Sequence, residues 1–223
     1  MQWDKEASLV TFGFSAFLKL LSMNETPRKT ELRRRLGPST GGYDYHKSFR
    51  RLARQYLVNG ASLDALLIEA NRINRITERQ SAIAALQRLA TWHKDTRNAV
   101  FVYRQNPAVF ESPSRLFKVR FEPDFELQTS AKRTAFHLWN TQKPKLAPGP
   151  TYAALALIEN AYQDQDGAPD DLAVLSMREP PTVYRFSEAV DNSALVASIV
   201  EQIEEGIRGA GLPPLAPEDR PTP

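Results

Sequence analysis

The sequence predicts an α+β protein in which an N-terminal helical part is followed by a mixed β-sheet with flanking helices. Three observations predict this class. Helix start and stop signals recur through residues 1–95. Apolar and polar residues alternate with a period of two in residues 117–121, which is typical of a strand with one buried face. The wholly apolar run 172–175 has the composition of a strand buried on both faces.

The helical region, 1–95, is expected to hold five helices. The first covers residues 7–22, a run that is almost continuously apolar and contains Lys19. A membrane span needs roughly 20 apolar residues, so this shorter run predicts a buried helix. Asp4 and Glu6 precede it, which argues against a signal peptide. The other four helices are expected at 29–36, 45–56, 62–71 and 77–92.

Residues 96–208 are predicted to form an α/β core around a central hairpin, 116–140. Its first arm is the alternating stretch that Pro123 interrupts, since proline donates no hydrogen bond to a ladder. Its second arm, 135–139, is rich in aromatic residues. Residues 209–223 are Pro-rich and expected to be disordered. The elements expected around the hairpin are a strand at 99–103, a helix at 151–162, strands at 172–175 and 182–186, and a helix at 195–207.

Charge is distributed unevenly along the chain. Residues 1–150 hold 25 Lys and Arg against 13 Asp and Glu, a formal charge of +12, whereas residues 151–223 hold 4 against 13, or −9. This asymmetry favours either an anionic partner such as DNA or RNA or neutralisation of one part by the other. The basic residues of two helices are candidates for phosphate contacts, with a solvated helix face as the alternative. They are Lys29, Arg33, Arg34, Arg35, Lys47, Arg50, Arg51 and Arg54.

Three carboxylates lie close together in the first arm of the hairpin. Glu122, Asp124 and Glu126 fall on alternate positions, which point to one face of an extended chain. Like charges at close range raise one another's pKa unless a cation intervenes, and Mg²⁺ prefers carboxylate oxygen. The alternative is a solvated strand face whose charges are offset by cross-strand pairs. The basic residues available for such pairs are Lys118, Arg120, Lys132 and Arg133.

Pro123-Asp124, a hairpin, and a second strand that ends in polar residues together resemble the restriction-endonuclease-like core, whose signature is PD-(D/E)xK. Asp124 matches the first element. The second strand ends His137-Leu138-Trp139-Asn140-Thr141-Gln142-Lys143. This stretch can be aligned with the (D/E)xK part of the signature in two frames, and neither puts an acid and a lysine at the two required positions. One frame puts Leu138 and Asn140 at those positions, and the other puts Asn140 and Lys143 one residue too far apart.

The resemblance implies a site that would work as follows if it were active. Asp124 and Glu122 would hold Mg²⁺, Lys143 would steady the attacked phosphate, and His137 would act as a base. The alternative for His137 is a hydrogen-bonded strand residue. The incomplete motif implies instead that the core is catalytically degenerate, and no other cofactor is expected.

Two functions follow as hypotheses. The first is a nucleic-acid-associated protein with a nuclease-like, catalytically degenerate core. The second is a protein-interaction adaptor or a subunit of a larger bacterial assembly, motivated by the apolar first helix, the acidic C-terminal part, and the aromatic residues Trp3, Tyr103 and Trp139. The chain contains no cysteine, which excludes disulfides and thiolate zinc sites and fits the expected cytoplasmic location. No membrane association is expected.

Overall fold

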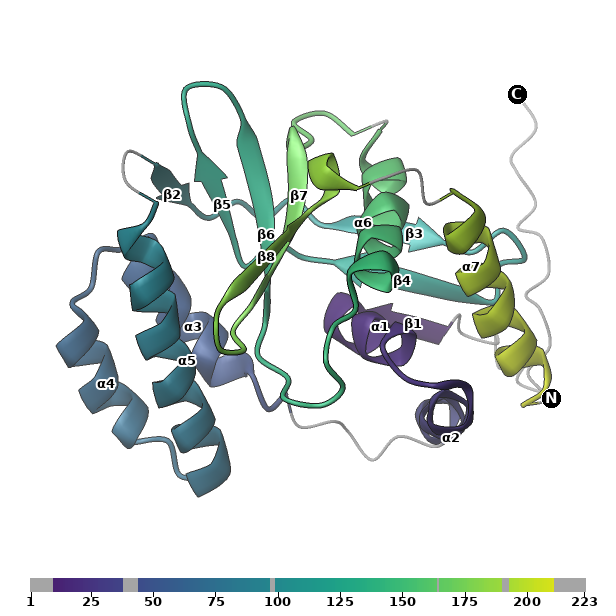
Figure 1. The fold of residues 1–223 in the computed structure, drawn as a ribbon, viewed down its shortest axis with the longest axis horizontal. Helices are drawn as coiled ribbons and strands as arrows, with labels where there is room; N and C mark the ends of the chain where they lie inside the picture. The colour runs from purple at the N-terminus through teal and green to yellow at the C-terminus, as the bar shows by residue number, and fades with distance from the viewer. Residues whose placement is uncertain (1–9, 38–43, 97–98, 164, 190–192, 211–223) are drawn as a thin grey trace, which may run out of the picture.

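A computed structural model describes residues 10–37, 44–96, 99–163, 165–189 and 193–210. It confirms the α+β class, with helices packed around two mixed sheets (Figure 1). The larger sheet has the strand order β2-β5-β6-β7-β8. Strands β6 and β7 are parallel, and every other pair in this sheet is antiparallel. Its strands are β2 (Val100–Val102), β5 (Phe125–Gln128), β6 (Arg133–Trp139), β7 (Asp171–Ser176) and β8 (Thr182–Arg185).

The smaller sheet has three strands in the order β1-β4-β3. Strand β1 (Val10–Gly13) runs parallel to β4 (Phe117–Phe121), and β3 (Ala108–Glu111) runs antiparallel to β4. Strands β4 and β5 follow each other in sequence but belong to different sheets. The chain therefore passes from one sheet to the other at residues 122–124.

The helices fall into two groups around two hydrophobic cores. Helices α3 (Lys47–Leu57), α4 (Leu63–Asn71) and α5 (Ile76–Lys94) pack on the face of the larger sheet that carries Phe136 and Leu138. The second core lies on the other face and includes Ala135, Trp139 and the smaller sheet. Figure 1 shows this second group on the opposite side of the sheet from α3–α5. It consists of α1 (Phe14–Leu21), α2 (Glu25–Leu36), α6 (Pro148–Tyr162) and α7 (Ser193–Arg208).

Local sequence signals account for several of these boundaries. The Ser62 side chain accepts a hydrogen bond from the amide of Ala65 and so caps α4. Pro148 stands in the first turn of α6, where its missing amide hydrogen costs nothing. Helix α6 connects the parallel strands β6 and β7, because parallel neighbours need a crossover connection.

The prediction of one helix over 7–22 is wrong at its start. Residues Val10–Gly13 form β1, and the helix begins at Phe14. Apolarity alone does not separate a buried strand from a buried helix, and the parallel pairing with β4 is a long-range contact that only the tertiary structure supplies. The helical region 1–95 thus contains five helices and also a strand among its described residues.

The prediction of a hairpin over 116–140 is corrected in its first arm. The hairpin is formed by β5 and β6, while the alternating stretch is β4 of the other sheet. Pro123 is therefore the point at which the chain changes sheets. Strand β3 has no counterpart among the strands predicted from the sequence. The predicted tail 209–223 lies, from residue 211 on, outside the described residues.

None of the helices in the described part of the chain is both long and apolar enough to span a membrane.

Candidate functional site

Asp124 lies where the chain leaves the smaller sheet and enters the larger one. Its backbone amide donates to the carbonyl of Phe136 at 2.8 Å, and its Oδ2 accepts from the amide of Leu138 at 2.7 Å. These two bonds fix the carboxylate against β6 at the start of the hairpin. Asp124 is only 7% exposed.

Ser15 reaches the same place from the other side of the sheet junction. Strands β1 and β4 are in register, with Gly13 opposite Arg120, so α1 starts level with the end of β4. Ser15 lies in the first turn of α1, and its Oγ is 2.7 Å from Nε2 of His137 on β6. The other ring nitrogen, Nδ1, is 3.4 Å from Asp124 Oδ2.

Arg50 of α3 completes the group. Its guanidinium donates to Ser15 Oγ at 2.6 Å, and its Nε is 3.5 Å from Asp124 Oδ1. Four side chains from α1, α3, β6 and the chain before β5 therefore meet at one point. We call Ser15, Arg50, Asp124 and His137 the Ser15 cluster.

The arginine sets the direction of the hydrogen bonds in the Ser15 cluster. A guanidinium donates and never accepts, so Ser15 Oγ accepts from Arg50, and its own hydrogen is available for His137 Nε2. The imidazole then carries its hydrogen on Nδ1, facing Asp124. The 3.4 Å separation is longer than a hydrogen bond, and Nδ1 has no hydrogen-bond partner within the described structure. The hydrogen bonds therefore run from Arg50 to Ser15 and from Ser15 to His137, and Asp124 lies on the far side of the imidazole ring.

Burial decides the protonation of this cluster. Burial raises the pKa of Asp124 to about 6, although Arg50, the Leu138 amide and Arg54 oppose the shift. Burial, with Arg50 and then His46 adding to it, lowers the pKa of His137 well below its ordinary value. At neutral pH the cluster therefore contains a neutral imidazole, an ionised but poorly stabilised carboxylate, and a guanidinium.

The predicted catalytic residues do not all gather here. Asp124 and His137 are brought together. Glu122 is exposed on the smaller-sheet side of Pro123 and pairs with Arg120. Asn140 is buried and donates to Ser81 at 3.0 Å, and Lys143 is exposed on the connection to α6 with no polar partner in the described part of the chain. The residues that lie beside Asp124 and His137 are Ser15 and Arg50, and not Glu122 and Lys143.

A Mg²⁺ site does not fit these residues. Asp124 supplies one carboxylate, which already accepts from Leu138 and lies against Arg50. The second carboxylate, Glu122, is paired elsewhere. Across the described residues, no group of three or more His, Asp or Glu side chains is placed to hold a metal ion. A positively charged guanidinium at 3.5 Å from Asp124 repels a cation.

The eight predicted phosphate-binding residues divide between two places. Helix α2 packs against α1 and α7, whereas α3 packs against α4 and α5. On α2, Arg34 and Arg35 pair with Glu31. Hydrogen bonds from Arg34 and Lys19 lower the pKa of Glu31 to about 2, although burial opposes this shift. Lys29 pairs with Glu25, Arg51 pairs with Glu69, and Arg33 and Lys47 are exposed. Arg50 and Arg54 belong to the Ser15 cluster or its edge.

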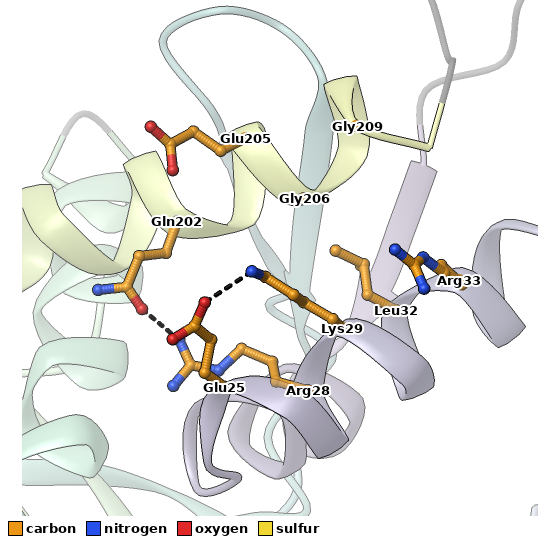
Figure 2. Close-up of a pocket in the computed structure, with 9 residues that line it drawn as sticks. All are labelled: Glu25, Arg28, Lys29, Leu32, Arg33, Gln202, Glu205, Gly206 and Gly209. Carbon is orange, nitrogen blue, oxygen red and sulfur yellow. Dashed lines mark hydrogen bonds and ion pairs between the residues drawn. The ribbon is translucent and has the colours of Figure 1, made fainter.

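A cleft of about 700 Å³ lies between α2 and α7 (Figure 2). Arg28 donates to Gln202 and Lys29 to Glu25 across its floor. The helices approach closely at Gly206, where an added Cβ would lie 2.5 Å from Leu32 Cδ2. Of its charged residues, Glu25 and Lys29 form an ion pair, whereas Arg33 and Glu205 are exposed.

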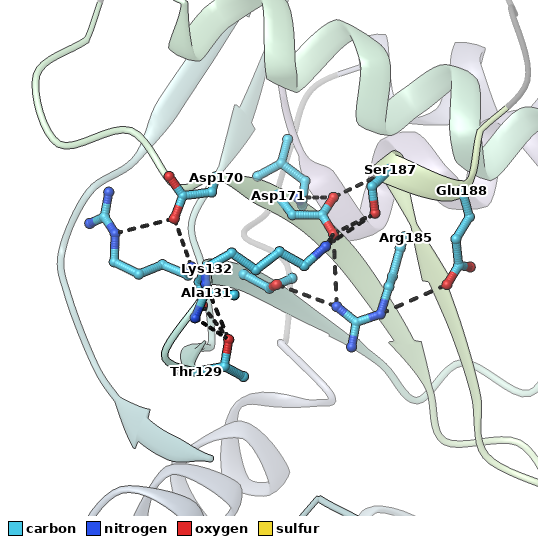
Figure 3. A network of polar contacts seen from close by, with 11 residues as sticks. Thr129, Ala131, Lys132, Asp170, Asp171, Arg185, Ser187 and Glu188 are labelled. Atoms are coloured by element: carbon cyan, nitrogen blue, oxygen red, sulfur yellow. Dashed lines mark hydrogen bonds and ion pairs between the residues drawn. The ribbon is translucent and has the colours of Figure 1, made fainter. Parts of the chain in front are cut away.

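Figure 3 shows a second buried carboxylate, Asp171 at the start of β7. Its oxygens accept from Lys132 at 3.0 Å and from the hydroxyl and amide of Ser187 at 2.8 and 3.0 Å. Arg185 lies 3.8 Å away. Burial alone would raise the pKa of Asp171, but the bonds from Lys132 and Ser187 outweigh it and lower that pKa. This network ties the turn before β6 to β7, β8 and the segment after β8.

Several features that motivated the adaptor hypothesis are buried or half-buried, and Trp3 lies outside the described residues. Trp139 is 1% exposed, Tyr103 is half-buried beneath the guanidinium of Arg54, and five residues of α1 are in the core. The adaptor role stays a prediction.

No protein-family model matches this chain, and no curated protein matches it. Among solved structures, one described as "Crystal structure of SSO0001" matches at 12% sequence identity, over 90% of this chain and 77% of that chain, with a TM-score of 0.38. A likeness at this level carries no argument about fold or function.

Proposed function

We propose that the protein binds nucleic acid through its phosphates at the Ser15 cluster, on a nuclease-like core that lacks a metal-dependent active site. The observation that carries the proposal is a pair of guanidiniums, from Arg50 and Arg54, beside a single buried carboxylate. The Nε atoms of both arginines are buried without a hydrogen-bond partner among the described residues. One buried carboxylate balances only one of the two guanidiniums, and the remaining positive charge is expected to attract an anion.

The surrounding charges favour the same ligand. His46 and His137 are neutral at pH 7, because burial and the nearby Arg50 lower both pKa values. Asp44 lies 3.8 Å from Arg50, but its side chain is 52% exposed, so water screens it. Lys47, one turn before Arg50 on α3, is exposed. A phosphate placed between Arg50 and Arg54 would meet two cations at the end of the sheet junction.

The contacts are to phosphate and not to bases, so binding is expected to be strong in low salt and weakly dependent on sequence. The basic first 150 residues add long-range attraction for a polyanion. Fluorescence anisotropy with labelled single-stranded DNA, duplex DNA and single-stranded RNA, at 50 to 300 mM salt, measures this directly.

The decisive variant is R50Q/R54Q. We expect it to weaken binding at least tenfold at 100 mM salt and to reduce the slope of log Kd against log salt by about 1.5, because two phosphate contacts are lost. The matched control is R72Q/K94Q, which removes the same charge from two exposed residues, the C-cap of α4 and the last residue of α5. Equal losses in both variants, or binding that ignores salt, would contradict the proposal.

A further inference from the structure

We propose that Ser15 is a metal-independent nucleophile toward phosphodiesters, with His137 as its general base and Asp124 as the residue that positions the ring. This inference deepens the proposed function, since it assigns a reaction to the same anionic ligand at the same site. It stands on the geometry of the Ser15 cluster.

The order of contacts is that of an activated serine. The hydroxyl of Ser15 is 2.7 Å from His137 Nε2, within the range for direct proton transfer to a base. The carboxylate of Asp124 lies behind the other ring nitrogen, where it favours the tautomer that leaves Nε2 free to accept. The separation of 3.4 Å at that point must shorten during the reaction, as contacts in unliganded sites commonly do.

The position of Ser15 in the fold suits a nucleophile. It lies just after a strand, in the first turn of a helix, and it is half-exposed, whereas His137 and Asp124 are buried behind it. Gly13, two residues earlier, is exposed, and a Cβ added there would meet no atom within 4 Å. The open space in front of Gly13 is where a substrate would approach.

The electrophile is inferred from the charges around Ser15. Arg50 donates to Ser15 Oγ, so a substrate atom bonded to that oxygen would have a guanidinium beside it. The first turn of α1 holds no acidic residue and no side-chain cap, so its free amides also face this region. Both features stabilise a negatively charged group. A phosphodiester carries that charge before attack as well as during it, whereas a carboxylic ester is neutral until the tetrahedral oxyanion forms.

The reaction balances without a metal or redox partner. Ser15 Oγ attacks phosphorus, its proton passes to His137 Nε2, and the bond from phosphorus to the leaving oxygen breaks. The imidazolium returns the proton to that leaving oxygen, which departs as an alcohol. A water molecule then attacks phosphorus in the serine-bound phosphodiester, the bond from phosphorus to Ser15 Oγ breaks, and His137 takes one proton from the water and gives it to Ser15 Oγ. The products are an alcohol and a phosphate monoester.

The first test uses a fluorophosphonate probe, which labels activated serine hydroxyls, on the full chain in EDTA. We expect one modified site, located at Ser15 by peptide mass, and no modification of S15A. The control S48A removes a serine of α3 that has no side-chain hydrogen bond in the described structure, and we expect it to be labelled like the wild type. Absence of label on Ser15 in the folded wild type would overturn the proposal.

The second test measures hydrolysis of bis(4-nitrophenyl) phosphate in EDTA. We expect the wild type to exceed S15A at least tenfold and H137Q to match S15A. Because His137 is buried and H137Q could fail to fold, the pH dependence of wild-type labelling is the independent measure of the pair formed by His137 and Asp124. It should rise as Asp124 ionises, in the field of Arg50, Arg54 and Glu122.

The outcomes separate this inference from the proposed function. A wild type that binds DNA but is neither labelled nor active overturns the inference and leaves the binding proposal intact. A wild type that is labelled at Ser15 but does not bind nucleic acid overturns the binding proposal and leaves the nucleophilic role of Ser15 intact. Hydrolysis of 4-nitrophenyl acetate without hydrolysis of the phosphodiester would overturn the substrate assignment.

Discussion

Asp124 and Asp171 are both buried beside the same five-stranded sheet, yet their surroundings are opposite. Asp171 accepts hydrogen bonds from Lys132 and Ser187, and together these lower its pKa in spite of burial. Asp124 accepts one amide bond, lies 3.5 Å from a guanidinium, and has a pKa raised to about 6. A carboxylate that is fully satisfied stabilises the fold, whereas one that is left poorly satisfied marks a site arranged for another purpose.

The largest expected effect belongs to Asp171. Replacing it with asparagine, D171N, leaves Lys132 and Arg185 without their buried carboxylate, and we expect a loss of about 3 kcal/mol in the free energy of unfolding at pH 7. Because its pKa is lowered, the stability that Asp171 contributes is present above its ordinary pKa and is lost as pH falls. The loss caused by D171N should therefore shrink toward pH 3.5.

Urea unfolding at pH 7 and pH 3.5 measures this prediction. The matched control is D170N, because the neighbouring Asp170 is 54% exposed in its side chain and pairs only with Arg133. We expect D170N to cost less than about 1 kcal/mol. If D171N were as stable as D170N, the hydrogen-bonded carboxylate of Asp171 would not stabilise the fold, which would contradict the contrast with Asp124.

Asp124 should behave in the opposite way. Its pKa is raised, so its contribution to stability is present below its ordinary pKa near 4 and is lost as pH rises through about 6. D124N removes the cost of ionisation and should stabilise the protein at pH 8, by about 2 kcal/mol and at most about 3. The gain should vanish near pH 4.

His137 also affects how the stability of the wild type depends on pH, but it does not affect the difference in stability between D124N and the wild type. Its pKa is lowered, so the stability linked to it is present above pH 6.5 and is lost as pH falls. The two groups act in opposite directions, and for that reason D124N is compared with the wild type at each pH. A D124N protein that is destabilised at pH 8 would show that Asp124 is structural, like Asp171.

The smallest effect is on binding. Protonation of Asp124 below pH 6 removes the carboxylate beside Arg50 and leaves the two guanidiniums unopposed. We expect the affinity of the wild type for single-stranded DNA to rise about threefold to tenfold between pH 7.5 and pH 5.5, and D124N at pH 7.5 to bind like the wild type at pH 5.5. Anisotropy at constant salt gives both values, and D170N provides the charge-matched control.

Sequence reasoning predicted the fold class and part of this site. Alternation, caps and Pro123 are local features, so the helices α2–α5 and the β5–β6 turn could be predicted from the chain, and Asp124 could be named as a candidate site residue. His137 was a candidate because it lies on the strand after Asp124. Both residues belong to a single hairpin, and hairpins are local.

The rest of the site depends on contacts that no local pattern encodes. Ser15 is 122 residues from His137, and it was hidden inside an apolar run that was interpreted as one helix. Gly13 is the signal that could have revealed the break between β1 and α1. Arg50 was predicted as one of eight surface cations, but packing of α3 against the sheet turns it inward to Asp124. Lys143 was predicted from motif spacing, and the structure leaves it exposed.

The central claim is that Asp124 is a poorly satisfied carboxylate beside an anion site. NMR titration of the carboxyl carbon of Asp124, with and without a short thymidine oligonucleotide, tests it most directly. We predict a pKa of about 6 in the free protein and a higher value with the oligonucleotide bound, because a phosphate near Arg50 adds negative charge beside the carboxylate. A pKa below 4 that does not change when the oligonucleotide is added would contradict the account.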